Sequence, residues 1–256
     1  MAVLQLVLAY DGTGFHGFAR QPGRRTIEGA LLDALERVLG RAPRLSVAGR
    51  TDAGVHAEGQ VVSLDVEADP DRIRRALNRM VGPEIVVRRA ARAPDGFDAR
   101  HGATARSYRY RIRTGEVPDP FTARYEWHRP GRYAVGPMRR AAGLLVGEHD
   151  FASFCRPGGR STVRRLDRLT VRPSREMLEI RARAGSFLHQ MVRSLVGTLV
   201  AVGEGRMEAR SMPEVLAARD RAAAGPVAPA QGLTLVAVHY AAHPRARRGS
   251  RAAGER

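Results

Sequence analysis

The residue best placed by its neighbours to do chemistry is Asp52, in the stretch AGRTDAGVHA that runs from Ala48 to Ala57. Small residues and glycines on both sides of Asp52 predict a loop that another backbone or a ligand can approach closely. Arg50 lies two positions earlier, and a nearby cation keeps a carboxylate ionised at neutral pH, as a nucleophile or a general base requires. An Asp among glycines also commonly caps a surface turn through its own backbone. The residues alone leave both interpretations open.

The elements on either side must hold this loop, and the first half of the chain predicts them from its local pattern. Thr26 is placed as the N-cap of an amphipathic helix that Gly40 ends, and Asp69 with Pro70 opens a second helix. Apolar and alternating runs mark the strands. The predicted order is a strand at 3–10, a helix at 27–39, strands at 45–48 and 62–67, the second helix, and a strand at 85–91.

A polar, irregular segment at 97–106 separates this half from a second one with a similar mixture of elements. From Ser107 the residues alternate, so one face of a strand carries Tyr108, Tyr110 and Ile112 while the other carries Arg109, Arg111 and Arg113. Further elements are expected at 135–146 (helix, ended by Gly147), 166–171 and 178–184 (paired strands), 187–202 (long helix), after Met212 and Pro213 (short helix) and 234–240 (strand).

Hairpin-like neighbours and helices that return on the same side favour an α+β fold with a largely antiparallel sheet over a doubly wound parallel one. We divide the chain into an N-terminal half at 1–103, a C-terminal half at 104–242 and a basic tail at 243–256. No letter-by-letter repeat relates the two halves, so any duplication is structural.

The charge balance points to a polyanionic partner. The chain has 43 basic residues, all arginine, against 26 acidic ones, which gives a formal net charge of +17. Such an excess favours nucleic acid before a membrane surface as the partner. The tail contributes +4 of this charge and leaves +13 on the rest of the chain.

The composition argues against several other classes of protein. The single cysteine, Cys155, cannot form an internal disulfide and fits a reducing compartment, and the eight histidines show no spacing typical of a metal site. The longest later apolar run, Leu195 to Val202, is far shorter than the roughly 20 residues that span a bilayer. No P-loop or Rossmann fingerprint is present. We therefore expect a cytoplasmic protein that uses neither a metal nor a cofactor.

The stretch AGRTDAGVHA, with Gly59-Gln60-Val61-Val62 after it, resembles the active-site segment of the TruA family of tRNA pseudouridine synthases. Other segments similar to the family follow in the family's order, and the resemblance extends from about Leu4 to Tyr240. These segments are YDGT at 10–13, FDAR at 97–100, ATARSYRY at 103–110, FLHQMVR at 187–193 and GLTLVAV at 232–238.

The resemblance implies two similar halves around a positively charged cleft, a homodimer, and isomerisation of uridines 38, 39 and 40 in the anticodon stem-loop of tRNA. It implies that Asp52 is the catalytic nucleophile or base and that Arg193 pairs with it. It also implies that Tyr108 packs on the uracil and can assist removal of its C5 proton, and that Leu233 lines the uracil pocket. By spacing alone, Tyr108 and Leu233 are core residues and Arg193 is a surface arginine with a buried stem.

The reaction breaks the bond from uracil N1 to the ribose and rejoins the base through C5, so nothing is added and nothing is lost. Asp52 could attack the ribose, add to the ring or remove a ribose proton, and the sequence does not choose among these. Arg50 is a candidate for wedging into the RNA stack or holding a phosphate. Further candidates for contacts with the RNA backbone are Arg20, Arg100, Arg106, Arg109, Arg111 and Arg160.

Two alternatives belong to other classes. A non-catalytic RNA-binding or RNA-chaperone protein would use the same basic cleft without needing Asp52. A metal-dependent nuclease would need a cluster of carboxylates or histidines, which the sequence does not show. One departure from the family pattern is Phe18-Ala19-Arg20-Gln21, where relatives commonly have Trp-Gln-Arg-Gln, and we expect it to alter packing or RNA contact there.

Overall fold

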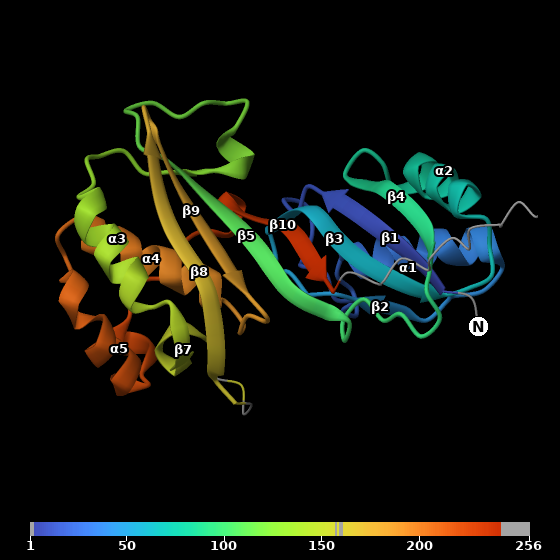
Figure 1. The fold of residues 1–256 in the computed structure, drawn as a ribbon. Helices are drawn as coiled ribbons and strands as arrows, with labels where there is room; N and C mark the ends of the chain where they lie inside the picture. Colours follow the sequence, from blue (N-terminus) through green and yellow to red (C-terminus); the bar gives the residue numbers. More distant parts are fainter. Residues whose placement is uncertain (1–2, 157, 159–160, 242–256) are drawn as a thin grey trace, which may run out of the picture.

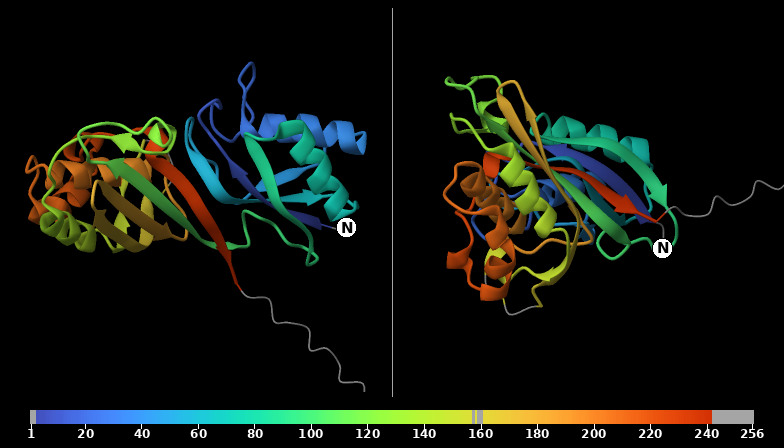
Figure 2. Two further views of the ribbon diagram at one scale, coloured as in Figure 1. Left: turned by 90° about the horizontal axis from the view of Figure 1, so that it is seen from above. Right: turned by 60° about the vertical axis from the view of Figure 1, so that its left-hand side comes forward.

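The structure is a computed structural model that describes residues 3–156, 158 and 161–241. The predicted basic tail at 243–256 and the candidate Arg160 lie outside the described residues. Figures 1 and 2 show an elongated molecule in which one sheet runs through two groups of helices. None of the described helices is long and apolar enough to cross a membrane.

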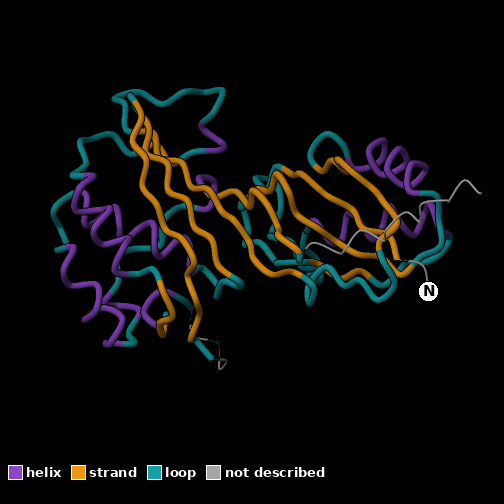
Figure 3. The backbone as a smooth tube through the Cα atoms, viewed as in Figure 1, coloured by secondary structure: helices purple, strands orange, loops and turns teal. Residues whose placement is uncertain are grey.

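Ten strands form the sheet, in the order β4-β1-β3-β10-β5-β9-β8-β7, with β2 paired to β3 and β6 paired to β5 (Figure 3). Neighbours are antiparallel except at β10–β3 and β5–β6. This arrangement confirms the α+β class with a largely antiparallel sheet. The bounds are β1 Val3–Tyr10, β2 Leu45–Val47, β3 His56–Asp65, β4 Ile85–Ala93, β5 Ala103–Arg113, β6 Trp127–His128, β7 Gly147–Asp150, β8 Val163–Ser174, β9 Met177–Ala184 and β10 Leu233–Tyr240.

The first two helices begin after the capping residues that the sequence predicts. The Thr26 side chain accepts from the N–H of Gly29, and the Asp69 side chain accepts from the first N–H groups of the second helix, so both ends are capped. Gly40 ends the first helix in the left-handed conformation. The bounds are α1 Ile27–Leu39, α2 Pro70–Val81, α3 Val135–Leu144, α4 Met191–Gly203 and α5 Met212–Ala218, with short 3₁₀ turns between elements.

The long helix expected at 187–202 is wrong at its start, because α4 begins at Met191. Gln190 has a left-handed backbone with φ 63°, which no helix can continue through. The apolar residues just before it are there for packing: Phe187 lies edge-to-face on Tyr108, with ring centroids 5.2 Å apart. Consequently His189 lies in a turn before the helix and not on it.

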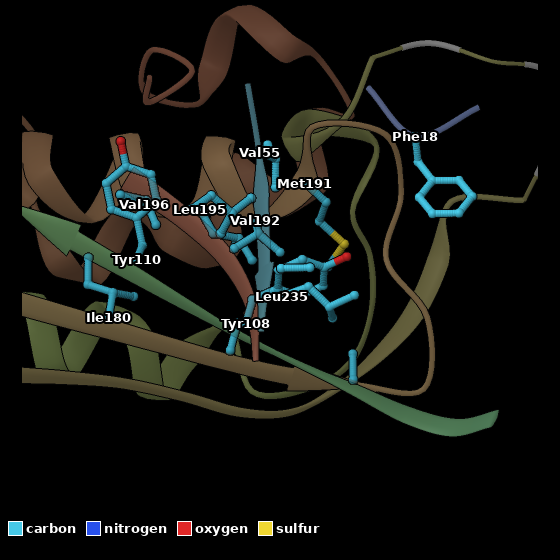
Figure 4. Packing of buried hydrophobic residues seen from close by; sticks show 14 of the residues in the cluster. Phe18, Val55, Tyr108, Tyr110, Ile180, Met191, Val192, Leu195, Val196 and Leu235 are labelled. Atoms are coloured by element: carbon cyan, nitrogen blue, oxygen red, sulfur yellow. The ribbon is translucent and has the colours of Figure 1, made fainter. Parts of the chain in front are cut away.

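One hydrophobic core runs through the whole sheet. Figure 4 shows Met191, Val192, Leu195 and Val196 of α4 packed with residues of β5 and β10, and the same buried cluster continues to the first-half strands. β10, the last strand of the chain, lies between β3 and β5 and so joins the two predicted halves. Gly59 of β3 permits this, since a Cβ there would lie 2.5 Å from the Val236 carbonyl oxygen.

Candidate active site

The Asp52 loop joins β2 to β3 at the middle of the sheet and is held from one side by the segment at 12–18. The Phe18 N–H donates to the Thr51 carbonyl at 3.0 Å, and the Gly54 N–H donates to the Phe15 carbonyl at 3.3 Å. Gly17 has φ 90° and no room for a side chain, because a Cβ would lie 3.0 Å from the Thr51 carbonyl oxygen. The loop is therefore fixed by backbone contacts and needs glycine where the two segments meet.

A buried polar network supports the loop from below. The Tyr10 hydroxyl and the Thr51 hydroxyl are 2.8 Å apart, and the Gln60 amide donates to both the Tyr10 oxygen and the Gly49 carbonyl, at 3.3 and 2.6 Å. Burial raises the pKa of Tyr10 to about 12, against hydrogen bonds that act to lower it. Tyr10 therefore stays protonated at neutral pH and holds the loop as a neutral hydrogen-bonding group.

The Asp52 carboxylate lies between two nitrogen-bearing side chains. Arg193 Nη1 is 3.6 Å from Oδ2, and His189 Nε2 is 3.4 Å from Oδ1, while the Asp52 side chain keeps a quarter of its surface exposed. Both contacts are longer than good hydrogen bonds, so they leave oxygen lone pairs of the carboxylate available for reaction.

Arg193 is aimed by the segment that packs against α4. Its Nε donates to the Ala228 carbonyl at 2.7 Å, and the Ala228 N–H donates back to the Arg193 carbonyl at 3.1 Å. This segment reaches α4 only because residue 197 is glycine, since a Cβ there would lie 1.7 Å from the Pro226 carbonyl oxygen. Arg193 thus binds the protein backbone through Nε and faces Asp52 through Nη1.

Tyr108 and Leu233 lie near the loop on adjacent strands. Tyr108 is 9% exposed, and its pKa is raised by burial and further by the negative charge of Asp52, so its hydroxyl is neutral at neutral pH. Leu233 is buried at the start of β10 and pairs with Tyr110, whereas Leu235 is the residue directly opposite Tyr108. Tyr108 therefore lies within electrostatic reach of Asp52, and Leu233 is two pairs further along the strands.

Arg106 is placed differently from the other candidate RNA contacts. It is 9% exposed, and burial lowers its pKa. Its guanidinium donates to the carbonyl of Ala48, just before the Asp52 loop, and to those of Gly185, Ala103 and Arg100. With these donors engaged inside the protein, Arg106 braces the loops that lead to Asp52 and His189 and does not face a ligand.

Arg50 and Arg20 are both exposed, and neither side chain pairs with a carboxylate of the described residues. Among the described residues, the basic side chains with a nitrogen within 4 Å of the Asp52 carboxylate are therefore Arg193 and His189, and Arg50 is not one of them. Sequence reasoning missed His189 as a site residue. The signal was its position four residues before Arg193. In the predicted continuous helix, that spacing would make His189 an ordinary surface neighbour of Arg193.

No group of three or more histidine, cysteine, aspartate or glutamate side chains within the described ranges is arranged to hold a metal ion. Asp11 and His56 lie close to each other, with Oδ1 and Nδ1 3.2 Å apart. The same Nδ1 already accepts a hydrogen bond from the Gly12 N–H at 3.1 Å.

Residues 6–101 and 141–241 match a family model described as tRNA pseudouridine synthase. Three curated relatives carry the name tRNA pseudouridine synthase A. The protein of Methylobacterium nodulans is 45% identical over 92% of this chain and 95% of its own length. That of Frankia casuarinae is 47% identical over 94% and 90%, and that of Geobacillus kaustophilus 40% identical over 93% and 94%.

Among solved structures, the archaeal box H/ACA sRNP Nop10-Cbf5 complex matches with a TM-score of 0.33 at 12% identity, over 77% of this chain and 44% of that chain. This likeness is too distant to support an inference about the site.

Proposed function

The chain belongs to the tRNA pseudouridine synthase family and isomerises uridine to pseudouridine in tRNA; we propose that Asp52 carries this reaction, at uridines 38, 39 and 40 of the anticodon stem-loop. The observation that carries the proposal is the partly exposed Asp52 carboxylate, flanked by Arg193 and His189 and within electrostatic reach of Tyr108. The same residues lie in the segments that resemble the family's motifs.

The reaction needs a group that opens the bond between uracil N1 and the ribose, and a wall that holds the free uracil while C5 bonds to the ribose. The C5 proton is then lost to solvent and N1 takes one up, so the atoms balance. Asp52 supplies the first, by attack on the ribose, by addition to the ring or by removal of a ribose proton. In each case the charge on the carboxylate is used and negative charge develops on the uracil. Arg193 stabilises the charge of the Asp52 carboxylate before the step, and it stays beside the site when negative charge develops on the uracil.

Tyr108 and Leu233 form the proposed wall. With its raised pKa, Tyr108 is a poor base in the free enzyme, so we assign it to stacking on the uracil and to hydrogen bonding through a neutral hydroxyl. Leu233 supplies apolar surface two pairs further along the strands. Arg50 and Arg20, both exposed, are assigned to RNA phosphates or to wedging beside the flipped base.

The test is release of tritium from C5 of uridine-labelled, unmodified tRNA, with no added metal or cofactor, by the wild type and by Asp52→Asn. We expect release by the wild type and at least a 1000-fold slower rate for the variant, because the amide is neither charged nor a useful nucleophile. Filter binding of the same tRNA should give equal affinities. Release by both proteins would refute the role of Asp52, and tight binding without release by either would favour a non-catalytic RNA-binding protein.

Three further proposals concern assembly and context. We propose a homodimer that grips one tRNA, two halves at 1–103 and 104–242 that face the substrate together, and a cytoplasmic location, where tRNA substrates are found. The family resemblance supports the homodimer and the two halves. The sheet that crosses both halves also supports their joint role. Sedimentation with and without tRNA tests the dimer, and a monomer that binds and reacts with normal rate would refute it.

A further inference from the structure

The outer face of the β5–β9–β8 sheet is rich in arginine. On β5, Tyr108 and Tyr110 turn to the side covered by α4, so Ser107, Arg109 and Arg111 turn to the other side. Figure 1 looks onto that other side, in front of which no described helix lies, whereas α3 and α4 cover the back of these strands. An uncovered sheet face normally carries mixed polar residues, but this one carries mostly arginine.

The strand register places the arginines of three strands in rows. Ser107 is paired with Arg183, and Arg183 in turn with Arg168, so these three lie side by side. In the next row Arg109 is opposite Arg181. The third row holds Arg111, Glu179 and Arg172. In antiparallel pairs, like charges directly opposite one another destabilise the sheet, so this pattern costs stability and calls for a functional reason.

Only part of this charge is neutralised within the protein. Arg109 pairs with Glu58 at 2.5 Å, and Arg181 pairs with Glu179 at 2.6 Å. The other four have no ion pair or side-chain hydrogen bond with any described residue, and three of them are exposed. These four, Arg111, Arg168, Arg172 and Arg183, we define as the arginine face.

Besides burial, the positive charge of Arg183 lowers the pKa of a neighbouring residue, His239. His239 of β10 has its Nε2 2.8 Å from the Ser107 hydroxyl. Its pKa is lowered by burial and by the charge of Arg183. The charge of Arg183 therefore reaches the neighbouring strand β10.

We propose that the arginine face binds the phosphate backbone of tRNA outside the anticodon stem-loop, an inference that rests on the proposed function. Tyr108 points to the opposite side of the same strand, so RNA on this face is separated from the reacting uridine by the sheet. Strands about 4.8 Å apart, with alternate residues about 6.7 Å apart along each, set guanidiniums at a spacing from which neighbouring phosphates can be held. A second copy of the chain fits less well, because a two-fold contact through this face would place arginine against arginine.

The test compares two variants that lose the same charge. R111Q/R168Q/R172Q/R183Q removes the arginine face, and R72Q/R75Q/R79Q/R88Q removes four exposed arginines of α2 and β4. Binding of full-length tRNA and of the isolated anticodon stem-loop is measured by filter assay between 0.05 and 0.3 M salt. Two double variants, R111Q/R183Q and R168Q/R172Q, serve if the quadruple variant does not fold.

We expect the first variant to bind full-length tRNA at least tenfold more weakly, with the slope of log K against log salt flatter by about 3, as loss of three to four phosphate contacts requires. Its affinity for the stem-loop should stay within twofold of the wild type, and the control variant should lose less on tRNA. Equal losses on tRNA and stem-loop, or a loss no larger than the control's, would overturn the proposal. A change of oligomeric state in sedimentation at unchanged tRNA affinity would assign the face to self-association instead. Binding is measured without turnover, so absence of tritium release by the wild type would count against the proposed function alone.

Discussion

Replacement of the buried Arg106 by methionine should destabilise the fold and slow the reaction, although the residue touches no substrate. Its guanidinium donates to the carbonyls of Ala48, Arg100, Ala103 and Gly185, and no described carboxylate pairs with it. Methionine fills much of the same space but satisfies none of these acceptors.

The magnitude follows from those bonds. A hydrogen bond from a charged donor contributes about 1.5–3 kcal/mol, and a buried carbonyl left without a partner costs about 1–3 kcal/mol. Some of the four carbonyls will find water, and removal of the buried charge returns part of its desolvation cost, so we expect a net loss of about 3–5 kcal/mol. For a chain of this size that corresponds to a fall in melting temperature of about 10 °C.

The assay combines thermal unfolding, single-turnover tritium release and the salt dependence of tRNA binding, with the exposed Arg79→Met on α2 as control. We expect the Arg106→Met rate to fall tenfold or more, since the braced loops lead to Asp52 and His189. Its salt slope should match that of the wild type. An unchanged melting temperature together with a slope flatter by about 0.7–0.9 would refute this reasoning and make Arg106 a phosphate contact.

Three further outcomes are expected. His189→Ala should lower kcat about tenfold, equivalent to about 1.4 kcal/mol, at unchanged KM, whereas His189→Gln should keep most of the rate because its amide can still donate to Asp52. Gly197→Ala should lower the melting temperature by about 2–8 °C and slow the reaction, since the new Cβ meets the Pro226 carbonyl and displaces the segment that aims the arginine partner of Asp52. Burial lowers the pKa of His56, so as pH falls below about 6.5 the unfolded chain takes up a proton that the folded one does not, and stability declines. His56→Gln should therefore lose about 2 °C less in melting temperature between pH 7.5 and 5.5 than the wild type.

The first two of these have a matched control variant. His101→Ala removes an exposed histidine that also pairs with a carboxylate, Asp98, and should leave kcat unchanged; a KM effect alone for the His189 variants would show that His189 binds RNA and does not orient Asp52. Gly143→Ala in α3 meets no neighbour within 4 Å and should not destabilise, so equal effects at the two glycines would contradict the packing argument. A pH dependence identical in His56→Gln and the wild type would remove His56 as its source.

The secondary structure was largely readable from local sequence because its causes are local. Strand alternation, capping by Thr26 and Asp69, and termination at Gly40 each depend on a few neighbouring residues, and the structure confirms them. The start of α4 was not readable, because Phe187 and Leu188 are apolar for the sake of packing on other elements, and that burial imitates a helical pattern.

The site also has features that depend on local sequence and others that depend on distant parts of the chain. The motif around Asp52 and the segments with Tyr108 and Arg193 identify the family from the sequence, but whether those side chains meet depends on strands far apart in the chain. Insertion of β10 between β3 and β5 is what draws the two halves together at the Asp52 loop.

The order of the elements, the family and the excess of positive charge follow from local sequence. The role of each arginine depends on the folded chain around it. A guanidinium has the same chemistry in every position, and its role depends on whether it is buried against carbonyls, as Arg106 is, paired with a carboxylate, as Arg193 is, or left unpartnered on an open sheet, as Arg183 is. Those surroundings come from residues distant in sequence, which local pattern cannot report.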